Sequence, residues 1–133
     1  MEVCMEHIIK SRKEDEMIDI TSIIQDDVNN SKIKDGIVIV FTPHTTAGIT
    51  INENADPDVV YDMLNTLRKL FPKDPNYRHL EGNSHAHLKA SFMGSSCTII
   101  IENGKLKLGI WQGVYFCEFD GPRTRKFYTK IIT

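Results

Sequence analysis

The sequence IVIVFTPHTTAGITINENADPD, residues 37–58, holds two predicted strands, a polar loop and the start of a helix. Its first five residues form an unbroken β-branched and aromatic run, which is typical of a central strand covered on both faces. Pro43 ends this strand, and apolar alternation over residues 47–52 predicts a second one. The sequence Asp-Pro-Asp at 56–58 predicts a helix start, because it supplies an N-cap acceptor, proline at N1 and an acid in the first turn.

Strands are predicted on both sides of this stretch from alternating or β-branched runs, at residues 3–10, 16–20, 98–101, 106–110, 114–119 and 126–132. Asn103-Gly104 predicts a hairpin turn between two of them. One helix is predicted after an N-cap at Thr21, and a longer one runs from Pro57 to Phe71.

Residues 85–93 alternate as a strand does, but Ser84 as N-cap and Gly94 as C-terminal stop favour a short helix. The sequence therefore predicts an α+β protein, a single compact domain over residues 1–133. We expect a mixed, mostly antiparallel sheet of about seven strands with two or three helices.

The composition is that of an ordinary globular domain, with 133 residues, 41% hydrophobic and 26% charged. A net charge of −2 gives no general attraction to nucleic acid or to an anionic membrane, so we expect neither as a partner. No apolar run approaches the roughly 20 residues of a membrane span. Three cysteines without C-x-x-C spacing argue against a disulfide framework. With no signal-peptide pattern at the N-terminus, we expect a cytoplasmic protein.

Four of the five histidines lie in two polar segments, His44 in one and His79, His85 and His87 in the other. Imidazole is a common ligand of zinc, and three such ligands leave a coordination position open. We therefore predict that His44, His79 and His87 hold a divalent metal, zinc in the first place or Mg²⁺ with a diphosphate substrate. His85 would point about 200° away from His87 on a helix, which makes His87 the better ligand. Each histidine taken alone also fits a hydrogen-bonded surface residue.

Carboxylates beside these histidines are candidates for proton transfer or for orienting a ligand imidazole. Glu53 and Glu81 have no evident structural role, so we predict them as catalytic residues. Asp56 is better explained as a helix cap.

Hydroxyl, cationic and aromatic side chains complete the predicted site. An anionic substrate would be bound by hydroxyl groups and by cations, predicted as Thr45, Thr46, Lys89 and Arg123. Arg125 and Lys126 fit solvated charges on an edge strand equally well. Trp111 and Gln112 place a flat apolar face beside an amide, which suits a heteroaromatic ring, although a half-buried core tryptophan is commoner.

Several phrases in this chain resemble the YjbQ-like family of small bacterial and archaeal proteins. They are HTTA at 44–47, NEN-DP at 52–57, EGN and AHLK within 81–89, SCTIIIENG at 96–104 and GIWQGV at 109–114. The resemblance covers nearly the whole chain from Gly36 to Arg125. Two positions depart from the family pattern: Ile110 stands where threonine is usual, and His85 where an acid is usual.

The resemblance implies a compact α+β domain that associates as a homotrimer, with the histidine pocket near subunit contacts. Some family members are described as secondary thiamine phosphate synthases, which join hydroxymethylpyrimidine diphosphate to a thiazole phosphate. We therefore expect a metal-binding enzyme acting on a phosphorylated small molecule, with thiamine phosphate synthesis as the named reaction. A metal-dependent hydrolase and a non-catalytic oligomer that binds a metal or small molecule stay open as alternatives.

Overall fold

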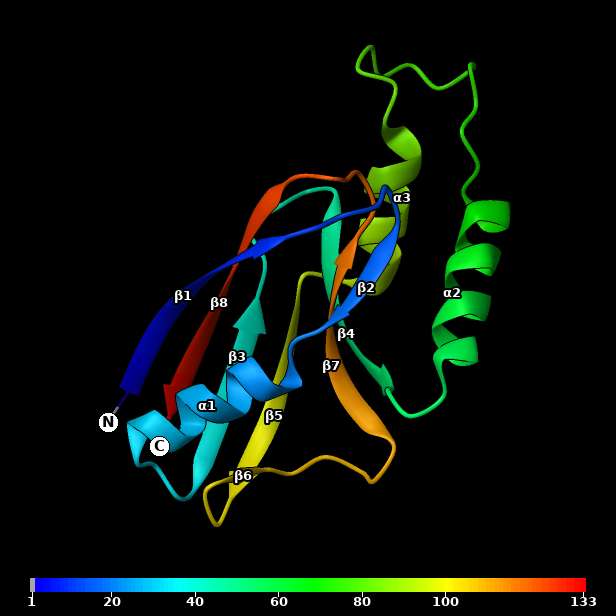
Figure 1. Ribbon diagram of the computed structural model, residues 1–133. Helices are drawn as coiled ribbons and strands as arrows, with labels where there is room; N and C mark the ends of the chain where they lie inside the picture. Colours follow the sequence, from blue (N-terminus) through cyan, green and yellow to red (C-terminus); the bar gives the residue numbers. More distant parts are fainter. Residues whose placement is uncertain (1) are drawn as a thin grey trace.

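The computed structural model describes residues 2–133, which form three helices and eight strands (Figure 1). In chain order the elements are β1 (Glu2–Lys10), β2 (Glu16–Asp19), α1 (Thr21–Ser31), β3 (Gly36–Phe41), β4 (Ala47–Glu53), α2 (Pro57–Leu70), α3 (Ser84–Met93), β5 (Ser96–Glu102), β6 (Lys105–Leu106), β7 (Gln112–Glu118) and β8 (Thr124–Ile132). The predicted α+β class is thus confirmed. Among residues 2–133, no helix is long and apolar enough to span a membrane.

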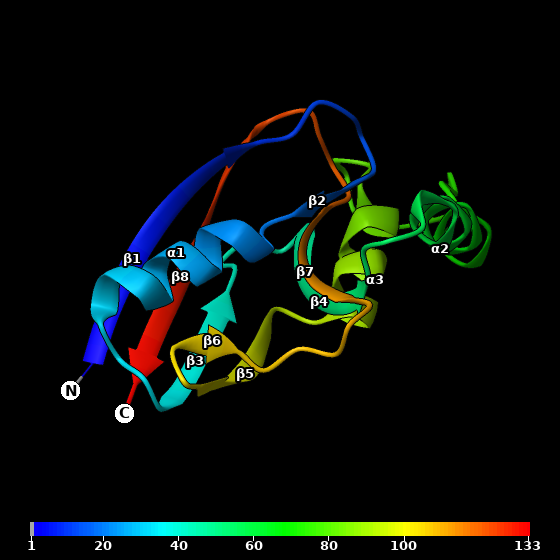
Figure 2. The ribbon, with the colours of Figure 1, turned by 60° about the horizontal axis from the view of Figure 1, so that its bottom comes forward.

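The strands form two sheets rather than the single sheet we expected. The larger has the order β1-β8-β3-β5-β6, the smaller has the order β2-β7-β4, and all strand pairs within residues 2–133 are antiparallel. The first and last strands are neighbours, so Glu2 of β1 pairs with Ile132 of β8 (Figure 2). This pairing places β8 inside its sheet, between β1 and β3.

The run 37–41 is central, as predicted, because β3 lies between β8 and β5. It is not covered on both faces, however. Val38 and Val40 are fully buried, whereas Phe41 on the other face is 41% exposed. The β-branched run therefore correctly predicted a central strand, but the prediction that both of its faces are covered was wrong.

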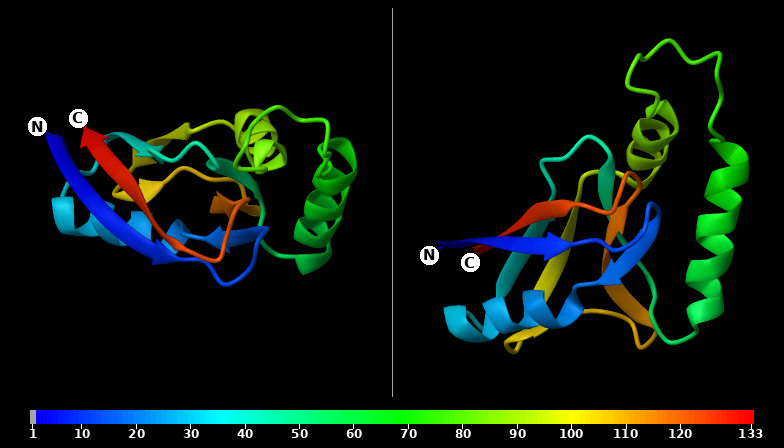
Figure 3. Two further views of the ribbon diagram at one scale, coloured as in Figure 1. Left: turned by 90° about the horizontal axis from the view of Figure 1, so that it is seen from above. Right: turned by 45° about the horizontal axis from the view of Figure 1, so that its top comes forward.

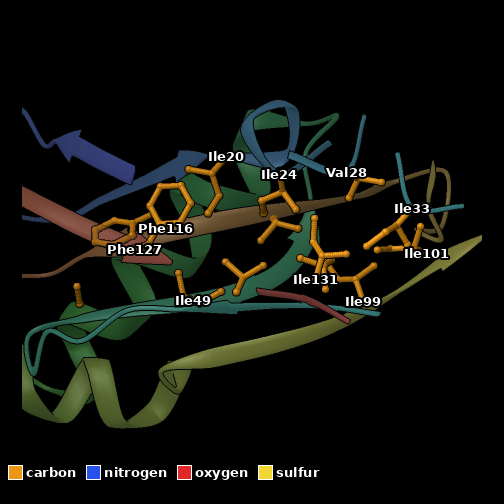
Figure 4. Packing of buried hydrophobic residues seen from close by; sticks show 14 residues of the cluster. Ile20, Ile24, Val28, Ile33, Ile49, Ile99, Ile101, Phe116, Phe127 and Ile131 are labelled. Carbon is orange, nitrogen blue, oxygen red and sulfur yellow. The ribbon is translucent and has the colours of Figure 1, made fainter. Parts of the chain in front are cut away.

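Strand β7 is covered on both faces, and its side chains alternate between two cores. Val114 and Phe116 point into the core under α1, whereas Tyr115 and Cys117 point toward α2 and α3. Helix α1 covers the first core, where Ile20, Ile24 and Val28 pack over both sheets; Figure 4 labels these side chains. Helices α3 and α2 form the outer layers on the opposite side of the smaller sheet (Figure 3).

The ends of the helices match the sequence signals only in part. Asp56 caps α2 as predicted, accepting a hydrogen bond from the backbone N–H of Asp58 at 2.9 Å. Thr21 is the first residue of α1 rather than its N-cap, because its hydroxyl accepts the N–H of Val114 and donates to Asp19.

Helix α3 is a helix as predicted, although Ser84 begins it and is not its cap. The predicted strand 106–110 shrinks to Lys105–Leu106, since only two residues pair across the turn at Asn103-Gly104.

Candidate functional site

A cleft of about 450 Å³ lies where three separate parts of the chain meet at one end of the sheets. These parts are the β3–β4 loop, the segment from the α2–α3 loop into α3, and the turn between β7 and β8, which Figure 1 shows side by side. We call it the histidine cleft, and its lining residues are Pro43, His44, Thr45, Thr46, His79, Glu81, Asn83, His87, Asp120, Arg123 and Arg125.

His44 is held by the backbone of the central strand β8. Its Nε2 accepts a hydrogen bond from the N–H of Lys126 at 2.9 Å. The hydroxyl of Thr42 reaches the same strand, donating to the carbonyl of Lys126 at 3.3 Å. A nitrogen that accepts a hydrogen bond carries no proton, so a neutral His44 has its proton on Nδ1.

We expect His44 to titrate below pH 6.5. Burial lowers its pKa below the ordinary value, and the nearby charge of Arg125 lowers the pKa further. Below pH 6.5 the unfolded chain therefore binds more protons than the folded one. The stability that His44 contributes is present above that pH and is lost as the pH falls through the lowered pKa.

Nuclear magnetic resonance of the imidazole nitrogens measures this directly, and the Lys126 amide proton should shift in step because it donates to Nε2. A midpoint above 6.5, or a proton on Nε2 at pH 7, would contradict the expectation. His44→Ala provides the control, since it should remove the pH-dependent shift of the Lys126 amide.

His79 and His87 form the second part of the cleft. His87 comes from the second turn of α3, and His79 comes from the loop before it. Their rings meet edge to face, with centroids 5.4 Å apart and an interplanar angle of 85°. Two imidazoles placed in this way can share one ligand between them. A turn closed by the Gly82 N–H on the His79 carbonyl at 3.1 Å fixes the loop, and Gly82 has a φ of +80° that glycine adopts without strain.

Asn83 links two carboxylates on the wall of the cleft. Its Nδ2 donates to Glu81 and to Asp120, both at 2.8 Å. Because both neighbours are acceptors, the amide nitrogen must face them. Arg123 closes the wall by donating to the Asp120 carboxylate and carbonyl, each at 2.9 Å, while its side chain stays half exposed. The guanidinium can therefore reach a ligand in the cleft.

A buried ion pair lies beneath this wall. Glu118 is fully buried and Arg125 is 3% exposed. Arg125 donates to both oxygens of Glu118 and also to the Thr46 hydroxyl at 2.7 Å. Burial by itself would raise the pKa of Glu118, but the hydrogen bonds from Arg125 and Ser11 outweigh it and hold the pKa below its ordinary value. The pair ties β8 and β7 to the loop that carries His44.

The structure gathers most of the predicted site residues and separates four of them. His44, Thr45, Thr46, His79, Glu81, His87 and Arg123 share the cleft. Glu53 is at the far end of β4, about 20 Å along the strand at roughly 3.3 Å per residue. Trp111 and Gln112 lie beside that far end, where the Trp111 carbonyl accepts the N–H of Asn54.

Lys89 is buried on another side of α3, with its Nζ 3.1 Å from Asp15.

Sequence reasoning gave little weight to Asn83, Asp120 and Arg125. Arg125 was equally compatible with a solvated charge on an edge strand. This alternative is wrong because Arg125 is buried, although β8 pairs only with β1 at this point. Asp120-Gly121 follows a predicted strand, so a polar cluster there is visible in the sequence. What places it in the cleft is a close approach: a Cβ on Gly121 would lie 2.3 Å from the carbonyl of Lys13.

These features define a small single-domain α+β protein with a cleft lined by histidine, arginine and carboxylate side chains. Residues 5–133 match the model of the family described as UPF0047 protein YjbQ-like, and the chain belongs to that family. A UPF0047 protein of Methanocaldococcus jannaschii is 59% identical over 93% of this chain and 90% of its own length. The UPF0047 protein YugU of Bacillus subtilis is 54% identical over 93% and 95% of the two chains.

Solved structures agree with this assignment. The crystal structure of an uncharacterized conserved YjbQ/UPF0047 family protein from Clostridium acetobutylicum is 62% identical, with a TM-score of 0.95 over 96% of this chain and 99% of that one. A protein of unknown function from Sulfolobus solfataricus is 30% identical, with a TM-score of 0.94 over 98% and 96% of the two chains. The two solved structures therefore resemble this fold almost equally, although their sequence identity to the chain falls from 62% to 30%.

Proposed function

We propose that the histidine cleft is an active site that binds a small phosphorylated compound and acts on it with the help of a divalent metal. The observation that carries the proposal is the convergence of His44, His79 and His87 with Arg123, from segments far apart in the sequence, on one cleft of about 450 Å³. A guanidinium fork binds phosphate oxygens in pairs, and hydroxyl groups such as that of Thr45 add donors.

The residues suit a metal to different degrees. His79 and His87, whose rings meet edge to face, are the stronger part of the proposed ligand set. His44 uses its Nε2 on the Lys126 N–H, so it joins a metal only by giving up that bond. In their present conformation, residues 2–133 contain no three His, Cys, Asp or Glu side chains arranged around one metal position. We therefore infer that ligand binding moves the exposed loop of His79 or turns His44. A bound metal would supply positive charge for a leaving phosphate or diphosphate.

The chain's own residues have separable roles in this proposal. Arg123 binds the anionic group, and its bonds to Asp120 hold the guanidinium in place. Glu81 is the group for proton transfer, because it lines the cleft whereas Glu53 does not. The family resemblance makes thiamine phosphate synthesis the first reaction to test.

The test uses the untagged chain with hydroxymethylpyrimidine diphosphate and thiazole phosphate, in the presence of Zn²⁺ or Mg²⁺, with product followed by mass spectrometry. His79→Ala and His87→Asn should lower the rate by a factor on the order of 100 or more. Gln112→Ala is the matched control and should keep the rate, since Gln112 lies outside the cleft.

Release of phosphate without coupling would favour a hydrolase, and binding without turnover would favour a non-catalytic role. A chain that binds neither metal nor phosphate compound would overturn the proposal.

We also propose that the chain assembles as a homotrimer through the outer face of the larger sheet. By the strand register Ile37, Ile39, Phe41 and Ile100 share this face, and Ile100 is 57% exposed. Exposed apolar sheet surface of this kind marks interfaces. Sedimentation velocity decides the point, because a monomer at micromolar concentration would contradict the proposal.

A further inference from the structure

A second hollow opens directly from the histidine cleft. It has a volume of about 510 Å³ and shares three lining residues with the cleft: His44, Thr45 and His87. Its remaining lining residues are all small, namely Ala47, Ala90, Ser91, Gly94 and Ser95. We call it the serine lobe. It runs between the start of β4 and the second half of α3, away from the charged wall.

The two hollows differ in the chemistry they offer. The histidine cleft contains Arg123, Arg125, Glu81 and Asp120. The serine lobe contains no charged side chain beyond the shared histidines; it offers methyl groups, two hydroxyl groups and backbone. A charged group is therefore expected to prefer the cleft, whereas an uncharged group loses less by leaving water for the lobe.

The walls of the serine lobe are fixed by backbone bonds rather than by flexible side chains. The Gly94 carbonyl accepts the N–H of Ile49 at 3.0 Å, and the Ser95 carbonyl accepts the N–H of Thr42 at 2.9 Å. Gly94 has φ +88° and ψ 165°, a conformation that is essentially limited to glycine. A Cβ at this position would meet no other atom within 4 Å, so the wall is open on the side where a side chain would stand. The small residues thus leave a formed space beside His87.

We propose that the serine lobe is the subsite for the uncharged part of the substrate, a compact polar ring that is joined to the phosphoryl group held in the histidine cleft. The inference rests on the proposed function, since the cleft must anchor the anionic end. His87 stands at the junction of the two hollows, next to the bond between ring and phosphate. The serine hydroxyl groups can each donate or accept a hydrogen bond at the ring edge, and the alanine methyl groups pack on its face.

The assignment differs from the one that the sequence suggested for a ring. Trp111 and Gln112 are at the far end of the smaller sheet, and Trp111 is 59% exposed. The hollow that adjoins the histidine cleft is instead lined by the two serines and Ala90. The substrate class is therefore a phosphate ester of a small uncharged polar ring.

Binding of two probes tests the proposal by calorimetry with the complete chain. Methyl phosphate carries the anionic group alone, and pyrimidin-5-ylmethyl phosphate adds an uncharged ring. We expect the ring compound to bind about tenfold more tightly, a modest gain for an open site. Ser91→Leu and Ser95→Leu should remove this gain by filling the lobe and leave methyl phosphate binding within about twofold. Both positions are exposed, so a larger side chain leaves the core intact.

Ser22→Leu is the matched control, because Ser22 is also exposed but lines neither the lobe nor the cleft, and it should keep the preference for the ring. If both probes bind the wild type equally, or if the serine variants weaken both probes alike, the lobe is not the ring subsite and the anionic cleft stands alone. If methyl phosphate does not bind at all, the proposed function fails and this inference fails with it.

Discussion

Arg125→Met will lower the free energy of unfolding by about 3–5 kcal/mol, the range found when one partner of a buried ion pair is removed. Glu118 is fully buried, and it would keep its charge without the guanidinium that now donates to both of its oxygens. The bonds that remain, from the Ser11 hydroxyl at 2.7 Å and from the Asp120 N–H at 3.0 Å, do not replace a full positive charge. Urea unfolding at pH 8 measures the loss.

Lys126→Met is the matched control. Lys126 is the next residue of β8, but its side chain is half exposed and its ammonium lies 3.7 Å from the exposed Glu6. Exposed pairs of this kind contribute about 1 kcal/mol or less. Equal losses in the two variants would show that the buried pair has no special weight.

Neutralising the unpaired charge of Glu118 should restore part of the stability that Arg125→Met loses. Glu118→Gln in the Arg125→Met background removes the buried charge. Its Oε1 can still accept the Asp120 N–H, and its Nε2 can donate to the Ser11 hydroxyl oxygen, so the double variant should be more stable than Arg125→Met alone. The Arg125→Met loss should also shrink at low pH, because a proton on Glu118 neutralises it. The cleft should loosen as well, since Arg125 also donates to Thr46.

The elements of this fold could be predicted from local signals, but their partners could not. The strand at residues 37–41 and the helix start at Asp-Pro-Asp were each predicted from a few consecutive residues, and the structure contains both. The division into two sheets depends on pairings between distant strands, such as β1 with β8, for which no single segment carries a signal. Arg125, which the sequence left open as a surface charge, is buried where its guanidinium meets Glu118 and the distant Thr46.

The candidate site was likewise predictable only in part. Residue type alone was enough to group His44 with His79 and His87, and these side chains do share one cleft. Closeness in sequence gave a wrong prediction for Glu53. It follows His44 by nine residues, but it lies at the far end of β4 and outside the cleft. An extended strand carries a side chain away from its start faster than any other regular element.

The link through Asn83 gives the second large expected effect. Asn83→Asp keeps the shape of the side chain but replaces the amide that now donates to Glu81 and Asp120, each at 2.8 Å. Two hydrogen bonds to charged groups are lost, and a third carboxylate is placed between two others at a position that is 7% exposed. We expect a loss of about 3 kcal/mol in unfolding free energy at pH 8.

The pH dependence of the unfolding free energy distinguishes repulsion among the carboxylates from an effect of the new charge on helix α3. Asn83 is also at the N-cap of α3, where a negative charge is favourable by about 1 kcal/mol or less. Repulsion raises the pKa of the introduced carboxyl group above its value in the unfolded chain. The folded state then binds more protons, so its stability relative to Asn83→Ala should fall as the pH rises from 5 to 8. Stabilisation by the helix end would instead lower that pKa, so the carboxyl group would be ionised in both states and no slope would remain between pH 5 and pH 8. Urea midpoints for the two variants at both pH values decide the point, and a stability difference that stays the same from pH 5 to pH 8 would contradict repulsion among the three carboxylates.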